Sequence, residues 1–109
     1  MNSRHVGSTF RSHLREMEKD PALKRAIAEH MEKARVAMLL RQVRQREHLT
    51  QLQLAQRAGV SQSVIARIEG NGASTLPRLD LLTRVVGAAG YHTALRAAKG
   101  RSVVEVTLA

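Results

Sequence analysis

The sequence predicts a mainly α-helical protein with a long N-terminal helix and a C-terminal β-hairpin. Apolar residues recur at helical spacing through most of residues 20–90, and the pattern changes to alternation after Gly90. The length of 109 residues suits one domain. We therefore expect three parts: an N-terminal arm over 1–19 that is helical or disordered, a helical domain over 20–90, and a hairpin over 91–109.

The first long helix is expected to begin at Asp20-Pro21. Aspartate is a good N-cap, and proline suits the first helical position. Apolar residues then keep helical spacing, without glycine or proline, as far as His48. This pattern indicates either one long helix or two helices joined near residues 32–35.

Two short helices are expected next, separated by a sharp turn. Thr50 and Ser61 are the candidate N-caps, and Gly59 between them can adopt the left-handed conformation that ends a helix. A loop follows over residues 70–74, and a last helix is expected from near Pro77 to Ala89.

The hairpin prediction rests on two alternating runs and a two-residue turn at Lys99-Gly100. An isolated hairpin is at best marginally stable in water, so its apolar face should cover the helical core or bind a second chain. A disordered tail is the alternative. The expected pairs, which form this dimerisation or partner surface, are Leu95 with Val104, Thr93 with Val106, and Tyr91 with Leu108.

Charge and composition favour duplex DNA as the partner. Lysine and arginine number 18 against 9 acidic residues, a net charge of +9, which favours a polyanion. Phe10 and Tyr91 are the only aromatic residues, too few for the stacking platforms of most single-strand binders. The lack of cysteine excludes disulfides, thiolate metal sites and cysteine nucleophiles.

One continuous run carries a specific resemblance. The residues Leu49–Glu69 resemble the Xre/Cro helix-turn-helix family, which includes phage repressors and many antitoxins, and a looser similarity extends over 36–90. The resemblance implies a phage-repressor-like helix-turn-helix bundle, in which the helix after Ser61 enters the major groove. The spacing of Val64, Ile65 and Ile68 independently places them on the inner stripe of that helix.

The resemblance also implies which residues contact DNA. The base-reading positions are Gln62, Ser63, Ala66 and Arg67. Glutamine suits adenine, arginine suits guanine, and alanine can meet a thymine methyl group. The phosphate-binding positions are Thr50, Gln51, Ser61 and Asn71. An ordinary solvated helix face is the alternative interpretation of these polar residues.

Three further positions bear on the comparison with the family. Arg44 and Glu69 match a pair that forms a structural ion pair in phage-repressor relatives. His48 stands where the family usually has glycine, so we expect it to adopt positive φ. The loop over 70–76 is slightly longer than is common in the family.

The flanks of the motif are an acidic-basic N-terminal segment with Lys19-Asp20-Pro21-Ala22-Leu23, a long helix, and a hairpin tail after Gly90. Together they resemble HigA-like antitoxins of type II toxin–antitoxin pairs. That similarity implies a homodimeric, autoregulating repressor that neutralises a RelE/HigB-like ribonuclease toxin. A stand-alone phage-type repressor, and an interaction module that has lost DNA binding, are the alternatives. We expect no catalytic residues, cofactor or metal site, because no catalytic motif and no short-spaced histidine pair is present. Without a bilayer-spanning run or a signal-peptide core, the expected location is the cytoplasm.

Overall fold

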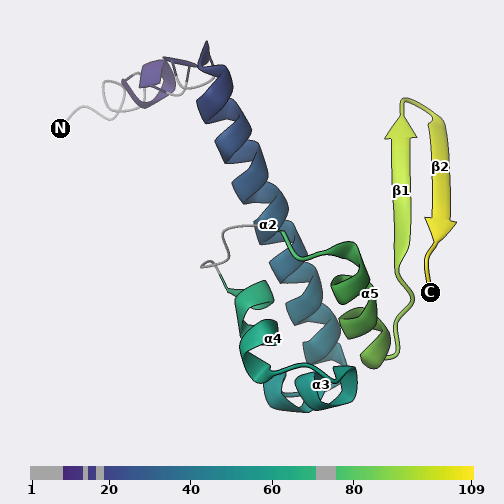
Figure 1. The fold of residues 1–109 in the computed structure, drawn as a ribbon. Coiled ribbons are helices and arrows are strands. Elements are labelled where there is room, and N and C mark those ends of the chain that lie inside the picture. Colours follow the sequence, from purple (N-terminus) through teal and green to yellow (C-terminus); the bar gives the residue numbers. More distant parts are fainter. Residues whose placement is uncertain (1–8, 14, 17–18, 71–75) are drawn as a thin grey trace. The chain divides into compact units, whose positions relative to one another are not determined.

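A computed structural model describes residues 9–13, 15, 16, 19–70 and 76–109 of the chain (Figure 1). The chain divides into two compact units, Met1–Glu32 and Lys33–Ala109. The described residues of the N-terminal arm are helical, which is one of the two states expected for it. The fold is mainly helical with a C-terminal antiparallel hairpin, as predicted.

The long helix α2 spans Pro21–Arg46 without interruption, so the alternative of two joined helices does not apply. Its N-terminus is capped as expected, because the Asp20 carboxylate accepts the backbone N–H groups of Ala22 at 3.0 Å and Leu23 at 3.4 Å. Past its C-terminus His48 has a φ of 55°, the predicted left-handed conformation.

The helices α3 (Gln51–Ala58) and α4 (Gln62–Glu69) form the expected pair. Thr50 and Gln53 make a reciprocal capping box: the threonine hydroxyl accepts the Gln53 N–H at 3.1 Å, and the Gln53 side chain accepts the Thr50 N–H at 2.9 Å. Gly59 ends α3 with a φ of 69°. The chain therefore turns between the two helices at a glycine, the residue type for which a left-handed backbone has the lowest steric cost.

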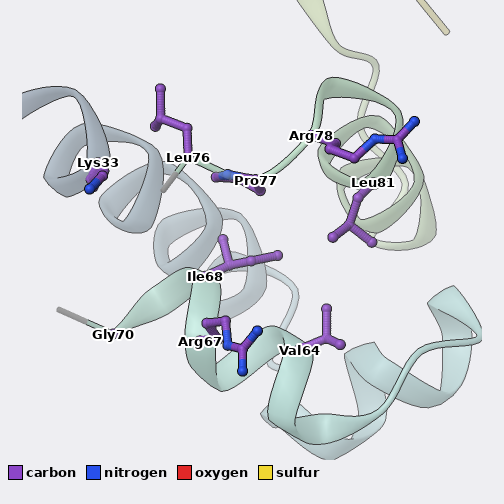
Figure 2. Close-up of a pocket in the computed structure, with 9 residues that line it drawn as sticks. All are labelled: Lys33, Val64, Arg67, Ile68, Gly70, Leu76, Pro77, Arg78 and Leu81. Carbon is purple, nitrogen blue, oxygen red and sulfur yellow. The ribbon is translucent and has the colours of Figure 1, made fainter. Parts of the chain in front are cut away.

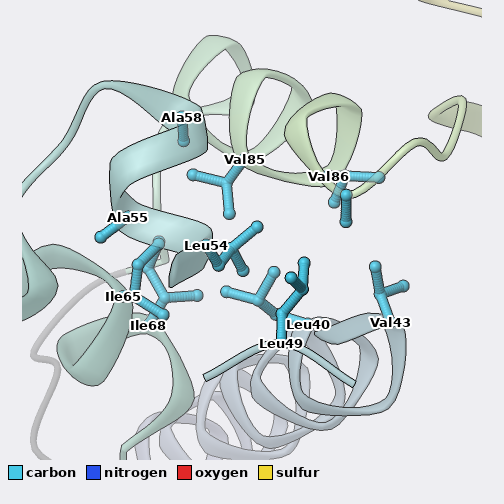
Figure 3. Close-up of a cluster of buried hydrophobic side chains, with 11 residues drawn as sticks. Leu40, Val43, Leu49, Leu54, Ala55, Ala58, Ile65, Ile68, Val85 and Val86 are labelled. Atoms are coloured by element: carbon cyan, nitrogen blue, oxygen red, sulfur yellow. The ribbon is translucent and has the colours of Figure 1, made fainter. Parts of the chain in front are cut away.

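The helix α5 (Leu79–Ala88) begins slightly later than the sequence suggested, after Arg78 rather than near Pro77. It packs with α3, α4 and the second half of α2 around one apolar core (Figure 3). The residues of this core are Leu40, Val43, Leu49, Leu54, Ala55, Ala58, Ile65, Ile68, Val85, Val86 and Ala89. None of the helices in the described ranges could cross a membrane.

The hairpin consists of β1 (Ala94–Lys99) and β2 (Ser102–Thr107), but its register differs from the predicted one by two residues. Leu95 pairs with Val106, not with Val104. The turn is Gly100-Arg101, and Gly100 has a φ of 58°. Both common two-residue turns need positive φ at their first central residue, and the predicted turn would have forced Lys99 into that conformation.

The two-residue shift keeps Leu95, Val104 and Val106 on one face, since side chains alternate along a strand. Thr93 lies opposite Leu108 and Ala109, not opposite Val106 as predicted: the Leu108 N–H donates to the Thr93 carbonyl at 2.7 Å, and the Thr93 N–H donates to the Ala109 carbonyl at 3.3 Å. The predicted Tyr91–Leu108 pair is wrong. Tyr91 lies before β1 and is half-buried against the helical core, so its side chain is part of the domain and not of the hairpin face.

A glycine exchange tests the turn between α3 and α4. A Cβ on Gly59 would meet no atom within 4 Å, so Gly59→Ala adds only the cost of a left-handed backbone. We expect the free energy of unfolding to fall by about 1 kcal/mol in urea titrations followed by circular dichroism. The control is Gly87→Ala in α5, where φ is not positive and space is open. That variant should gain about 0.5 kcal/mol. Equal effects of the two substitutions would contradict the explanation.

Candidate nucleic-acid interface

The helix α4 has one buried face and one exposed face. Ile65 and Ile68 are buried in the core, and Val64 packs at its edge. The opposite stripe consists of Gln62, Ser63, Ala66 and Arg67, which are all exposed. The structure thus brings the four predicted base-reading residues together on one outward surface, where a helix in a major groove carries its contacts.

The position of α4 relative to α3 is fixed by small residues. Ala55 is buried where the two helices approach, and a larger side chain there would push them apart. The N–H of Val60 donates to the Ala55 carbonyl at 3.0 Å, which closes the turn that Gly59 makes. The crossing of α3 and α4 is therefore set by backbone geometry and not by the exposed polar residues.

A buried ion pair ties the end of α4 to α2. The Arg44 guanidinium binds both carboxylate oxygens of Glu69, with Nε to Oε2 and Nη2 to Oε1 each at 2.8 Å. The Glu69 side chain is only 2% exposed and that of Arg44 15%. The hydrogen bond to Glu69 raises the pKa of Arg44, in opposition to the effect of burial. This is the pair that the family resemblance implied.

Two further bonds complete this cluster. Arg44 Nη1 donates to the Leu49 carbonyl at 2.9 Å, which fixes the segment that leads into α3. Arg41 Nη2 donates to the Glu69 backbone carbonyl at 2.8 Å, one of the carbonyls that lack a partner at a helix C-terminus. Sequence reasoning missed Arg41. Its position one turn before Arg44 on the same helix face is the signal that could have indicated it.

The N-terminal ends of α3 and α4 differ in how their caps are used. The Thr50 hydroxyl accepts a bond in the capping box and still has its own proton to donate to a phosphate. Ser61 occupies the N-cap of α4 with an extended backbone, and its hydroxyl makes no capping bond to the described residues that follow. Gln51, the next predicted phosphate contact, is half-buried. Asn71 lies outside the described residues.

Arg67 also borders a cavity of about 250 Å³ at the C-terminal end of α4 (Figure 2). The lining combines apolar and cationic side chains, and no acidic residue is among them. The lining residues are Lys33, Val64, Arg67, Ile68, Gly70, Leu76, Pro77, Arg78 and Leu81. The cavity thus places cationic side chains next to Arg67, and one of them, Arg78, also pairs with Asp80 at 3.3 Å.

Comparison with known families identifies the same region. The family model described as helix-turn-helix matches residues 40–95, just over half of the chain. The matched range begins in the last turns of α2, contains α3, α4 and α5, and ends at the start of β1. Comparisons with curated proteins and with solved structures found no match.

The buried ion pair predicts a large loss of stability when one partner is removed. Glu69→Gln leaves the Arg44 guanidinium without its counter-charge in a site that is mostly closed to water. The free energy of unfolding in urea should fall by about 3 kcal/mol. A matched control is Arg78→Gln, because Arg78 pairs with Asp80 at 3.3 Å but both side chains are highly exposed. Its expected cost is below about 1 kcal/mol. Similar losses in the two variants would show that burial is not what gives the Glu69 pair its effect.

Proposed function

The chain belongs to the helix-turn-helix family of Xre/Cro-like DNA-binding regulators, and we propose that it represses transcription by reading an operator with the exposed face of α4. The observation that supports this most is the outward stripe of Gln62, Ser63, Ala66 and Arg67, which no core contact explains. A buried stripe would have argued against a DNA contact. A repressor of this kind acts in the cytoplasm.

Each side chain of the stripe can contact a base edge. Arg67 can donate two hydrogen bonds to the O6 and N7 atoms of guanine, and Gln62 can bind the N6 and N7 atoms of adenine. The Ala66 methyl group is suited to contact a thymine methyl, and Ser63 can bind either kind of base. We propose that these four residues determine the operator sequence.

Contacts to the phosphates would set the register of the domain on DNA. The N-terminus of α4 offers unpaired N–H groups and the positive end of the helix dipole next to Ser61. The Thr50 hydroxyl and the Gln51 side chain lie at the corresponding end of α3. Asn71 stays a proposed phosphate contact on the resemblance alone. Such contacts carry affinity but no sequence information.

We further propose that the repressor is a homodimer. A single module of this size buries limited DNA surface, and two copies on half-sites one helical turn apart bind much more tightly. The hairpin supports this proposal because every residue of β1 and β2 is exposed. Its apolar face, with Leu95, Val104 and Val106, is available to a second chain.

The finer proposal is that the repressor is the antitoxin of a type II toxin–antitoxin pair. Its support is the resemblance of the flanking segments to HigA-like antitoxins, together with a compact N-terminal unit that lies before the matched residues 40–95. We propose that this unit is the part of the chain that binds a RelE/HigB-like ribonuclease. A stand-alone repressor has the same DNA interface and no such partner.

Arg67→Ala should weaken operator binding by about tenfold to a hundredfold and relax specificity at one base position. The measurement is an electrophoretic mobility shift on the protein's own promoter and on a set of single-base operator variants. Arg84→Ala is the matched control, because it removes the same charge from an exposed residue of α5. It should leave the base preference unchanged.

An equal loss of affinity for operator and for random DNA would contradict base reading by Arg67. If the unaltered chain shows no preference for any promoter, the interaction module without DNA binding becomes the better interpretation.

The antitoxin proposal predicts a direct effect on the product of the neighbouring gene. The full chain should bind that protein and inhibit its cleavage of messenger RNA in a purified system. Arg67→Ala should inhibit equally well, since Arg67 is not part of the N-terminal unit that we propose to bind the toxin. Undiminished cleavage at a large excess of the chain would leave a stand-alone repressor.

A further inference from the structure

The backbone of β2 has an open edge with a defined set of free groups. Lys99 and Ser102 close the two-residue turn, and hydrogen-bonded and non-hydrogen-bonded pairs alternate along an antiparallel ladder. The bond from the Leu108 N–H to the Thr93 carbonyl fits this alternation, because Leu108 is an even number of residues from Ser102. The even-numbered residues of β2 therefore bond to β1, and Val103, Glu105 and Thr107 direct their N–H and C=O groups away from it.

The two edges of the hairpin differ in how well they can accept another strand. β1 has the sequence ALRAAK, in which alanines have low β propensity and Arg96 and Lys99 protect an edge by their charge. β2 has the sequence SVVEVT, which is rich in β-branched residues and has Glu105 as its one charge. The outer edge of β2 is thus the one suited to pairing.

The exposed apolar side chains indicate that the hairpin needs more strands. Val104 is 65% exposed and Val106 55%. Two strands alone are marginally stable in water, whereas a sheet of three or more strands with an apolar face is stable. A second copy of the chain supplies an identical open edge, and a two-fold axis makes such an edge self-complementary.

The side chains of β2 select among the symmetric registers. A two-fold axis that passes through Glu105 would place the two Glu105 carboxylates directly opposite each other, which is unfavourable. An axis at Val104 pairs Val103 with Glu105 of the second copy and Ser102 with Val106 of the second copy, so that apolar side chains face polar ones. Axes at Val103 or Thr107 include fewer apolar pairs.

An axis at Val106 pairs like with like. Val106 faces Val106 of the second copy, Val104 faces Leu108 of the second copy, and Glu105 faces Thr107 of the second copy. The valine and leucine pairs lie on the face that Val104 and Val106 share, and the pair of Glu105 with Thr107 lies on the other face. The bonding groups of Glu105 and Thr107 point outward, so these two residues exchange backbone hydrogen bonds across the new interface.

We propose that β2 pairs antiparallel with β2 of a second copy about a two-fold axis at Val106, so that the two hairpins form one four-stranded sheet. This inference rests on the proposed homodimer and specifies its interface. In this arrangement Val106 and its symmetry mate form a non-hydrogen-bonded pair with a Cα to Cα separation of about 4.5 Å.

A single-cysteine scan of the full chain tests the register, and the natural sequence has no cysteine to interfere. Val106→Cys should form a covalent dimer under mild oxidation, because the expected separation fits a disulfide. Val104→Cys and Glu105→Cys should stay uncross-linked, since each would face a different residue of the second copy. The double variant Val104→Cys with Leu108→Cys should cross-link.

The outcomes separate this inference from the proposed homodimer. Cross-linking of Val104→Cys or Glu105→Cys in place of Val106→Cys would overturn the register. A dimer in sedimentation equilibrium with no cross-link at any scanned position would overturn the β2 interface and leave the homodimer intact. A monomer in the same experiment would overturn both.

A proline pair tests the edge independently of the register. Ala94 and Thr107 face each other in the hairpin, and each directs its N–H outward on its own edge. Thr107→Pro removes a donor from the β2 edge and should weaken the dimer about tenfold or more, while Ala94→Pro removes one from the β1 edge and should leave the dimer unchanged. Circular dichroism checks that both variants keep the helical domain. Equal dimer constants for the two variants would overturn the proposal.

Discussion

The buried carboxylate of Glu69 organises the DNA-binding domain. The Glu69 carboxylate is buried at the end of α4, and such a group is stable only when another charge and hydrogen bonds compensate it. Arg44 supplies both, with two bonds at 2.8 Å, and a third bond from the same guanidinium holds the Leu49 carbonyl. One side chain of α2 thereby fixes the end of α4 and the entry into α3, and the reading face is presented at a set angle.

The remaining constraints on α4 are local and apolar. Ile65 and Ile68 bury its inner face, Ala55 permits close approach of α3, and Gly59 makes the turn between the two helices. None of these interactions involves the exposed stripe that begins at Gln62. The fold and the proposed DNA contacts therefore use opposite sides of the same short helix, which is the arrangement expected when a scaffold positions contacts that must remain free for a ligand.

Residue type and spacing predicted the helix caps, and the family resemblance predicted the tertiary pair of Arg44 with Glu69. The caps at Asp20 and Thr50 follow from residue type and spacing. The left-handed backbone at His48 was predicted from the resemblance, because the family usually has glycine at that position. The hairpin was predicted, but its register depends on which residue takes positive φ in the turn, and Gly100 takes it as the first central residue. The contact of Arg41 with the Glu69 carbonyl joins distant segments, so its partner could not be predicted, although Arg41 lies one turn before Arg44 on the same helix face.

The outward stripe of α4 has a consequence for how regulators of this kind diverge. Because Gln62, Ser63, Ala66 and Arg67 contribute nothing to the core, their substitution costs little folding free energy. A duplicated gene can thus acquire a new target by a few changes on one surface while its scaffold stays intact. Several such proteins can then coexist in one cell without regulating each other's promoters.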